Sequence, residues 1–254
     1  MKILLIDIET APNTAHVWGL FKQNVALNQI IDTSRTLCFA AKWAGKPSKV
    51  MYYSENKDGR EQMLAAAHKL LEEADAVITY NGERFDLPIL NKEFVVDNLP
   101  PPAPVHSVDL LRIVKRRFRF ASNKLDHVCK ELGLGNKVRH EGHELWVNCM
   151  KGDPKAWKKM QKYNKHDVTL LEKLYNKILP WIDTHPNRAM FQPVSGVPVC
   201  PNCGGHHVHS RGLQHNKTQS YTRYRCEDCG TWSRGRYTVR SKDKNVLTQI
   251  GAAR

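Results

Sequence analysis

The sequence predicts an α/β protein made of one large domain and a small C-terminal β-type module. Three observations predict it: a strand-length apolar run opens the chain, a later segment repeats apolar residues at helical spacing, and four cysteines form two pairs near the C-terminus. The length of 254 residues exceeds that of one typical domain, ~150 residues. Apolar residues make up 41% of the chain, which is enough for a sizeable core.

The predicted strands are short apolar segments. Residues 2–9 (KILLIDIE) form a nearly continuous apolar run, which is typical of a strand buried on both faces of a sheet. Further segments of strand length follow in the first half of the chain. We expect these strands at residues 15–19, 36–43, 49–53, 76–80 and 106–110.

The predicted helices follow apolar stripes and helix-start signals. Within residues 58–73 an apolar residue recurs every three or four positions, which places the apolar side chains on one helix face. Asp153 is a candidate N-cap for a long helix over residues 154–179, because Pro154 then occupies the first helical position, where proline is tolerated. Other helices are expected at residues 83–96, 111–118 and 123–132.

A change in composition divides the chain. Residues 183–198 lose all periodicity and contain three prolines and one glycine, which is typical of a linker. We therefore expect a large domain over residues 1–182 and a separate module with a basic tail over residues 199–254. This module is too small to bury much of a core by itself.

The net charge indicates a polyanionic partner. Thirty-nine Lys and Arg residues face 25 Asp and Glu residues, which gives a formal charge of +14. Such an excess suits nucleic acid, because cationic side chains displace counterions from phosphates. The chain has no apolar run of membrane-spanning length, and carboxylates follow the first apolar run where a signal-peptide cleavage site would lie. We expect no membrane partner and a cytoplasmic location.

Four carboxylates and a phenol fall at positions that would bring them together. Asp7 and Glu9 are two residues apart on the first strand and therefore project from the same face. Asp86 follows the end of another expected strand, and Tyr163 and Asp167 share one face of the long helix. Burying two neighbouring carboxylates destabilises a fold unless a cation lies between them. The alternative is that the strand ends at the surface, where both carboxylates reach solvent. Two divalent cations, which prefer oxygen ligands, would satisfy the four acids.

The segments DIET (7–10), NGERFD (81–86) and YNKHD (163–167) resemble the three motifs of the DEDD 3′–5′ exonucleases, in the tyrosine subclass. The resemblance covers roughly residues 1–182. It extends to the proofreading domains of family B DNA polymerases and to stand-alone, often phage-encoded, exonucleases, for which the location would be the host cytoplasm. It implies an RNase H-like mixed sheet flanked by helices.

The same resemblance implies roles for the acids and the phenol. Two Mg²⁺ or Mn²⁺ ions would be held by Asp7, Glu9, Asp86 and Asp167, with Asp7 bridging both ions. Tyr163 would orient the attacking water or help to deprotonate it. The expected activity is a metal-dependent 3′–5′ exonuclease that hydrolyses phosphodiester bonds at single-stranded or frayed DNA 3′ ends, with DNA preferred over RNA.

Other residues of the motifs are candidate substrate contacts. By resemblance, Thr10 and Phe85 would contact the 3′-terminal nucleotide, and Asn81 would orient the site through hydrogen bonds. For Phe85 a place in the core is the slightly favoured alternative.

Two further polar segments have competing interpretations. Arg116 and Arg117 lie in KRRFRF (115–120), where basic residues are interleaved with aromatic ones. This segment either contacts the phosphates of a nucleic acid or is a solvated helix face with two core phenylalanines. His140 and His143 have metal-like spacing in RHEGHELW, but two histidines in a charged loop are expected to be solvated.

The cysteine pairs predict a metal site. Cys200, Cys203, Cys226 and Cys229 form two pairs, each with two residues between, and 22 residues separate the pairs. In a cytoplasmic protein this spacing indicates one structural Zn²⁺ in a closed tetrahedral site, not disulfides. The module resembles a zinc ribbon, and RYRCEDCGTW in particular resembles ribbons attached to transposases.

The ribbon is expected to bind nucleic acid, with protein docking as the alternative. Arg223, Arg225 and Trp232 belong to a set of basic and aromatic residues interleaved around the cysteines, a composition that suits phosphates and bases.

Two other functions remain as alternatives for the whole chain. One is a non-catalytic nucleic-acid-binding or replisome-docking protein on the same scaffold, and the intact set of acids argues against it. The other is an RNase H-like endonuclease, against which Tyr163, four residues before Asp167, favours the exonuclease. A polymerase or another replication or repair protein is a candidate partner.

Overall fold

The computed structural model describes residues 1–45, 47, 49–194, 196–240 and 246–247. It divides into two compact units, Met1–Asn176 and Lys177–Arg254, which are considered separately below. Part of the expected basic tail, residues 241–245 and 248–254, lies outside the described residues. Among the helices of the described residues, none has the length and apolar character needed to cross a membrane.

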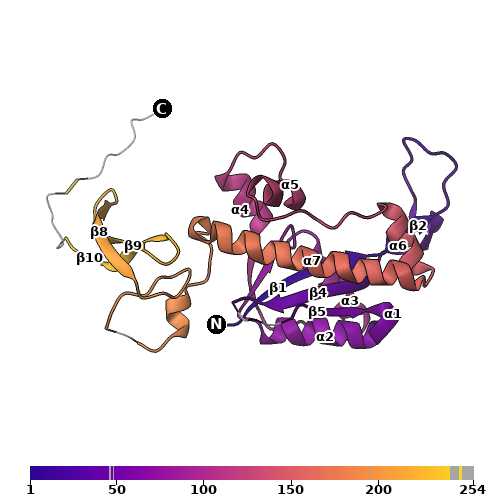
Figure 1. Cartoon of the computed structure of the whole chain (residues 1–254), viewed down its shortest axis with the longest axis horizontal. Coiled ribbons are helices and arrows are strands. Elements are labelled where there is room, and N and C mark those ends of the chain that lie inside the picture. Colours follow the sequence, from indigo (N-terminus) through magenta and orange to yellow (C-terminus); the bar gives the residue numbers. More distant parts are fainter. Residues whose placement is uncertain (46, 48, 195, 241–245, 248–254) are drawn as a thin grey trace. The chain divides into compact units, whose positions relative to one another are not determined.

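A five-stranded mixed sheet forms the centre of the first unit (Figure 1). The strand order is β5-β4-β1-β6-β7, with β1 antiparallel to β4 and parallel to β6. The central position of β1 agrees with its apolar sequence, since a central strand has both faces covered. The strands are β1 (Ile3–Thr10), β4 (Thr36–Trp43), β5 (Met51–Ser54), β6 (Ala76–Thr79) and β7 (His106–Asp109). The predicted mixed sheet flanked by helices is confirmed.

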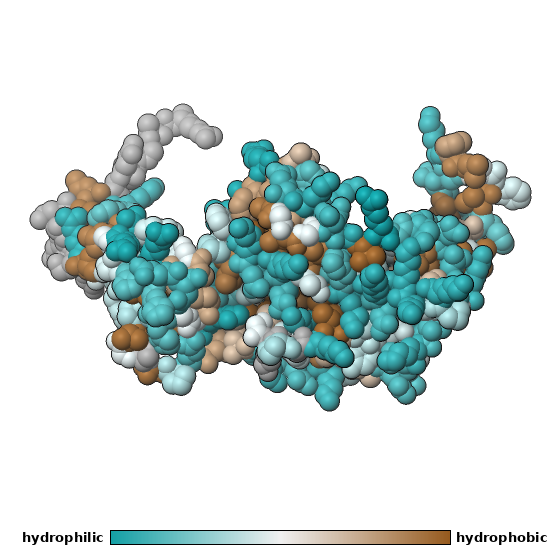
Figure 2. Space-filling view, viewed as in Figure 1, coloured by the Kyte–Doolittle hydropathy of each residue, from teal (hydrophilic) through white to brown (hydrophobic). Residues whose placement is uncertain are grey.

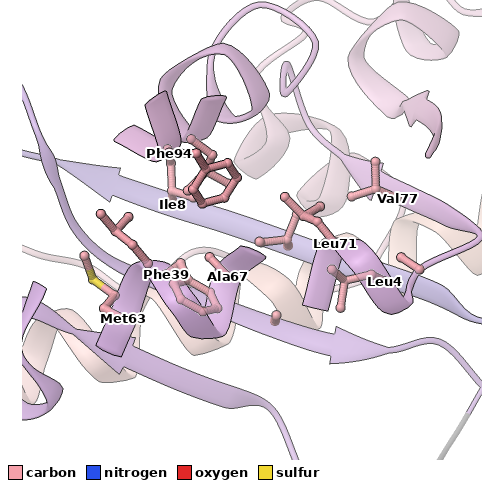
Figure 3. Packing of buried hydrophobic residues seen from close by; sticks show 13 residues of the cluster. Leu4, Ile8, Phe39, Met63, Ala67, Leu71, Val77 and Phe94 are labelled. Atoms are coloured by element: carbon pink, nitrogen blue, oxygen red, sulfur yellow. The ribbon is translucent and has the colours of Figure 1, made fainter. Parts of the chain in front are cut away.

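One face of the sheet packs on α2 (Arg60–Glu73) and α3 (Asp86–Val96), with the short α1 (Glu55–Asp58) before them. The apolar stripe predicted for residues 58–73 supplies the buried side chains of α2. Burying each such large apolar side chain contributes ~1.5–3 kcal/mol, so this layer is the main stabilising core of the unit. Figure 3 shows this packing for Leu4, Ile8, Phe39, Met63, Ala67, Leu71, Val77 and Phe94.

The opposite face is covered by the long helix α7 (Pro154–Ile178) (Figure 1). A second apolar cluster joins this helix to β4 through Cys38, Trp157 and Met160. The smaller helices of the unit are α4 (Leu110–Arg117), α5 (Leu125–Glu131) and α6 (His143–Met150), of which the sequence analysis did not predict α6.

The strand predicted at residues 15–19 is wrong. The chain forms only the short β2 (Thr14–Ala15), which pairs with β3 (Ile30–Asp32), and residues 16–19 are not in a strand. Apolar content alone misled the prediction, because Val17 and Trp18 are exposed rather than packed in a sheet.

The helix predicted at residues 83–96 begins later, at Asp86, because a tight turn precedes it. Asn81 has φ +75°, and its carbonyl accepts a hydrogen bond from the Phe85 amide at 3.0 Å. A Cβ on Gly82 would lie 2.4 Å from the Thr79 side chain, so only glycine fits this turn. The turn therefore places Asp86 at the start of α3.

The second unit contains a three-stranded antiparallel sheet of order β10-β9-β8. Its strands are β8 (Val208–His215), β9 (Ser220–Cys226) and β10 (Trp232–Thr238), and short 3₁₀ helices lie at Leu179–Trp181 and Arg188–Phe191. Asn202 donates hydrogen bonds to the carbonyl oxygens of Leu179 (2.8 Å) and Ile182 (3.0 Å), which ties the first cysteine loop to the 3₁₀ turn at the start of this unit. This arrangement is consistent with a zinc ribbon.

Candidate active site and cysteine cluster

The alternation of side chains along β1 separates core residues from acids. Leu4, Ile6 and Ile8 face the apolar cluster under α2 and α3, whereas Asp7 and Glu9 point to the opposite face. There, Asn164 of α7 donates its side-chain N–H to the Asp7 carbonyl at 3.1 Å and to Asp7 Oδ2 at 2.7 Å. The helix therefore holds the Asp7 carboxylate in one orientation.

Three acids meet between β1 and α7. Each of Asp7, Glu9 and Asp167 has a carboxylate oxygen within 4.8 Å of the others. Tyr163 lies one helical turn before Asp167 and is buried beside the same acids. We call these three carboxylates the acid cluster.

Asp86 approaches from the start of α3. Its Oδ1 accepts a hydrogen bond from the Ile8 amide at 3.0 Å, because the parallel pairing of β6 with β1 ends at Leu5 and leaves that amide free. The side chain is only 4% exposed, and its charge raises the pKa of both Asp7 and Glu9. Asp86 is thus a close neighbour of the acid cluster from a different element.

Burial raises the pKa of all four acids, and for Asp7 and Glu9 the charges of the neighbouring acids raise it further. Burial, followed by the charges of Glu9, Asp86 and Asp167, raises the pKa of Asp7 well above its ordinary value. Burial also raises the pKa of Glu9 to about 8 and that of Asp86 to about 6, and it raises the pKa of Asp167. Asp167 Oδ1 is buried without a hydrogen-bond partner. An all-oxygen donor set with excess negative charge and an unsatisfied oxygen fits hard divalent cations such as Mg²⁺ or Mn²⁺.

Lys137 is a site residue that the sequence analysis missed. Its Nζ lies 2.5 Å from Asp167 Oδ2 and donates a hydrogen bond to the Tyr163 hydroxyl at 3.1 Å. The lysine amide is held by Asp126 Oδ1 at 2.6 Å, which fixes the loop that follows α5. No motif marks Lys137, because it reaches the acids from a loop whose path the local sequence does not specify.

Trp146 of the unpredicted helix α6 also reaches the acids. Its indole N–H donates to Glu9 Oε2 at 3.1 Å. The His140 ring lies 5.0 Å from the Trp146 ring and 4.8 Å from the Tyr163 ring, both in edge contact. His140 is therefore half-buried against the site, and the expectation that it is simply solvated is wrong.

The residues expected to contact substrate differ in their exposure and in their hydrogen bonds. Phe85 is 41% exposed immediately before Asp86, so the interpretation that it belongs to the core is wrong, while Thr10 is half-buried at the end of β1. The Asn81 amide donates to Asp109 Oδ1 at 2.8 Å within the turn before α3. Arg116 and Arg117 are exposed in the last turn of α4.

The phenylalanines of KRRFRF are not core residues. Phe118 and Phe120 are half-buried, and their ring centroids lie 5.6 Å apart. This leaves the segment as a basic surface with a small aromatic pair.

The four cysteines of the second unit form a compact cluster. Their sulfur atoms all lie within 4.8 Å of one another, with Cys200 and Cys229 at 3.6 Å and Cys203 and Cys226 also at 3.6 Å. A tetrahedral site with Zn–S bonds of ~2.3 Å requires sulfur atoms about 3.8 Å apart. The Gly205 amide donates to Cys203 Sγ at 3.3 Å, as expected for a thiolate ligand. The cluster therefore fits one Zn²⁺.

One face of the C-terminal sheet combines arginines with an exposed tryptophan. The guanidinium carbons of Arg223 and Arg225 lie 4.9 and 5.9 Å from the Trp232 ring, which is 53% exposed. Trp232 and Arg225 are cross-strand partners, as are Arg234 and Arg223. A shallow hollow lies over this face, lined by Gln214, Arg223, Trp232, Ser233 and Arg234.

The raised acid pKa values predict how the metal-free protein responds to pH. Because the folded pKa values exceed those of the unfolded chain, the folded state binds more protons between about pH 4 and pH 8. Stability is therefore highest on the acid side and is lost as pH rises through this interval. We expect the melting temperature in EDTA to fall over this range, and Mn²⁺ to reduce the fall. A melting temperature that rises with pH in EDTA would contradict this electrostatic description.

Comparisons with known proteins agree with this architecture. Residues 27–179 match the RNase H superfamily, which is more than half of the chain. The fold is similar to that of the family B DNA polymerase from the hyperthermophilic archaeon Pyrobaculum calidifontis, with a TM-score of 0.54 and 19% sequence identity over 70% of this chain. The chain spans only 24% of that polymerase. No curated protein matches the sequence. On the match over residues 27–179, together with the mixed sheet and its flanking helices, the chain belongs to the RNase H superfamily.

Proposed function

We propose that this protein is a metal-dependent 3′–5′ exonuclease that hydrolyses phosphodiester bonds at single-stranded or frayed DNA ends. The observation that carries the proposal is the acid cluster, in which Asp7, Glu9 and Asp167 converge from β1 and α7 with oxygens within 4.8 Å. Lys137 neutralises only part of this buried like charge, and the remainder weakens the fold unless a further cation binds there. A nuclease site that binds divalent cations would explain why the protein keeps these destabilising carboxylates together.

The ligand set would be Asp7, Glu9, Asp86 and Asp167, holding two Mg²⁺ or Mn²⁺ ions. When bound, such ions supply charge stabilisation for the phosphodiester and lower the pKa of water. Asn164 and Trp146 orient Asp7 and Glu9 through their hydrogen bonds, so the protein positions the ligands before substrate arrives.

Tyr163 would orient the attacking water as a neutral phenol. Burial, followed by the charges of Asp167 and Glu9, raises the pKa of Tyr163 above its ordinary value, so the hydroxyl keeps its proton at neutral pH. The neutral hydroxyl can donate a hydrogen bond to the water or accept one from it. Phe85, exposed beside Asp86, would stack on the 3′-terminal base.

The C-terminal unit would hold nucleic acid through its Arg–Trp face. Trp232 offers an exposed ring for a base, and Arg223 and Arg225 place positive charge beside it for phosphates. Zn²⁺ at the four cysteines would be structural. Under this proposal Trp232→Ala weakens the binding of single strands, and a ribbon that docks on protein instead would leave that binding unchanged.

A strand-shortening assay tests the main proposal. The protein is incubated with 5′-labelled single-stranded DNA or RNA in Mg²⁺, Mn²⁺ or EDTA. We expect a ladder that shortens from the 3′ end and is absent in EDTA, with DNA degraded faster than RNA. Cleavage of circular single-stranded DNA would instead support the endonuclease alternative. Intact substrate with a persistent shifted band in every condition would support the non-catalytic alternative.

Lys137 is expected to act as a positioning residue in this reaction. Lys137→Met removes the ammonium group that holds the Tyr163 hydroxyl and neutralises Asp167, so kcat should fall about tenfold with little change in KM. The Mn²⁺ concentration for half-maximal activity should fall as well, because no fixed cation then competes for Asp167.

Lys155→Met, a change of an exposed lysine in the first turn of α7, is the matched control and should alter neither value. If the Lys137 variant keeps full kcat and an unchanged metal requirement, the lysine merely ties its loop to α7.

A further inference from the structure

An extended arm projects from the first unit beyond the sheet (Figure 1). We define the arm as residues 14–32, which contain β2, the 3₁₀ turn Leu27–Gln29 and β3. Large apolar residues lie along its projecting part, and Figure 2 shows hydrophobic atoms gathered there beneath a hydrophilic end. Monomeric proteins rarely expose such groups without a binding role.

Hydrogen bonds hold the base and stem of the arm in place. The Ala11 amide donates to the Arg35 carbonyl at 2.8 Å, and the His16 amide donates to the Gln29 carbonyl at 2.9 Å. Arg35 makes a two-point ion pair with Glu55, at 3.0 and 3.1 Å. The arm is therefore a defined element built on two paired β-strands and not a loose loop.

The tip of the arm carries side chains with almost no cover. Trp18 is 98% exposed, Leu20 and Leu27 are both 87% exposed, and Phe21 is 85% exposed. None of these side chains contributes to either apolar cluster of the unit. Their use must lie in contact with something outside the unit.

The position of the arm links it to the acid cluster. It follows shortly after Thr10, the residue after Glu9, and Trp18 lies eight positions beyond Thr10 in the sequence. Eight extended residues reach at most about 29 Å, which corresponds to about eight base pairs at 3.4 Å each. The tip therefore lies within reach of the duplex next to a 3′ end held at the acids.

The projecting part of the arm carries no carboxylate that would repel phosphates. Lys22 lies there, and the acid of the arm, Asp32, lies at its base, in a chain of net charge +14. Aromatic and aliphatic side chains on a projecting element are also the groups that wedge between base steps and unstack them.

We propose that the arm is a strand-separating wedge, whose tip stacks on nucleobases at a junction of double and single strand and frees the 3′ end. This inference rests on the proposed exonuclease function and names its substrate as a duplex end, in addition to free single strands. A frayed end lowers the cost of unpairing, so the wedge matters most on fully paired substrate.

The test compares single-stranded DNA with the same labelled strand annealed to its complement. The double variant Trp18→Ser/Phe21→Ser should degrade the single strand within about twofold of wild type but the duplex at least about tenfold more slowly. Val95→Ser, which removes an exposed apolar side chain of α3, is the matched control and should leave both rates unchanged. An unchanged ratio of the two rates, or an equal loss on both substrates, would overturn the wedge.

A binding measurement keeps the inference separable from nuclease activity. A duplex with 2-aminopurine near its 3′ end should gain fluorescence when the Asp7→Asn protein binds, because the base unstacks, and the gain should vanish when the two tip substitutions are added. If the tip substitutions leave this fluorescence unchanged and instead abolish self-association in sedimentation, the arm is a contact between protein copies and the wedge is overturned. If the wild-type protein degraded neither substrate while the fluorescence gain still depended on the tip residues, the wedge would be retained and the proposed exonuclease rejected.

Discussion

Asp7→Asn is expected to abolish nuclease activity, by at least about 10³-fold, and at the same time to stabilise the metal-free protein. The activity is lost because Asp7 contributes oxygens at the centre of the acid cluster. The substitution keeps the shape of the side chain, and its remaining carbonyl oxygen still accepts the hydrogen bond from Asn164. Loss of activity would therefore report the missing charge and not a collapsed site.

The gain in stability follows from the electrostatics of the cluster. Burial and the neighbouring charges of Glu9, Asp86 and Asp167 raise the pKa of Asp7, so its ionised form weakens the folded state at neutral pH. Removing that charge should raise the melting temperature in EDTA by several degrees, at roughly 2–4 °C for each kcal/mol of relief. The same substitution should weaken the stabilisation by Mn²⁺, since one ligand is gone.

Glu93→Gln is the matched control because Glu93 is a buried carboxylate that does have cationic partners. It pairs with Arg60 and, at 3.0 Å, with Lys92 on the other side of the sheet. We expect this variant to be less stable than wild type and fully active. Thermal melting in EDTA and the strand-shortening assay measure both quantities on each variant. An Asp7→Asn protein that melts lower than wild type would contradict the proposed strain in the cluster.

The elements and the acids could be predicted because each depends on local spacing. Asp7 and Glu9 share a face through the two-residue period of a strand, and Tyr163 and Asp167 share one through the four-residue spacing of a helix. That these acids actually meet depends on β1 lying under α7, which the motif order indicated and spacing alone did not.

What could not be predicted depends on long-range contacts or on exposure. Lys137 and Trp146 reach the acids from a loop and a short helix whose sequences resemble many solvated segments. Phe85 and Trp18 are apolar yet exposed, and an apolar residue is assigned to a core or a strand when only its type is known. These residues lie at the candidate site or in the arm, where functional requirements are expected to override the local sequence preferences on which a prediction depends.

The second large effect concerns the cysteine cluster. Cys203→Ser is expected to abolish binding of one Zn²⁺ per chain and to unfold the three-stranded sheet β8–β10. Among the described residues of the ribbon, Cys200, Tyr221 and Cys226 are the buried apolar side chains, which is far too few to stabilise it. Structural zinc supplies ~10–16 kcal/mol in comparable small units, so its loss removes most of the driving force for folding.

Two measurements with opposite expected results distinguish this effect from general damage. Hydrogen exchange should show loss of protection along β9 in Cys203→Ser but unchanged protection in α7 up to Asn176, because the unit Met1–Asn176 has its own two apolar clusters. Cleavage of a short single strand should persist within about twofold, since the acid cluster belongs entirely to that unit, while the affinity for longer strands should fall with the loss of Trp232 and its arginines.

His207→Ala is the matched control for the zinc site. His207 lies beside the cysteines but pairs with Asp228 at 2.6 Å, and the four sulfur atoms complete the site without it. This variant should keep one zinc and a protected β9. If Cys203→Ser kept its zinc and the double variant Cys203→Ser/His207→Ala lost it, the metal would be held by three cysteines and a histidine. The spacing of the two cysteine pairs argues for four sulfur ligands, because each pair closes its own tight turn, with Gly204 at φ +77° and Gly230 at φ +82°.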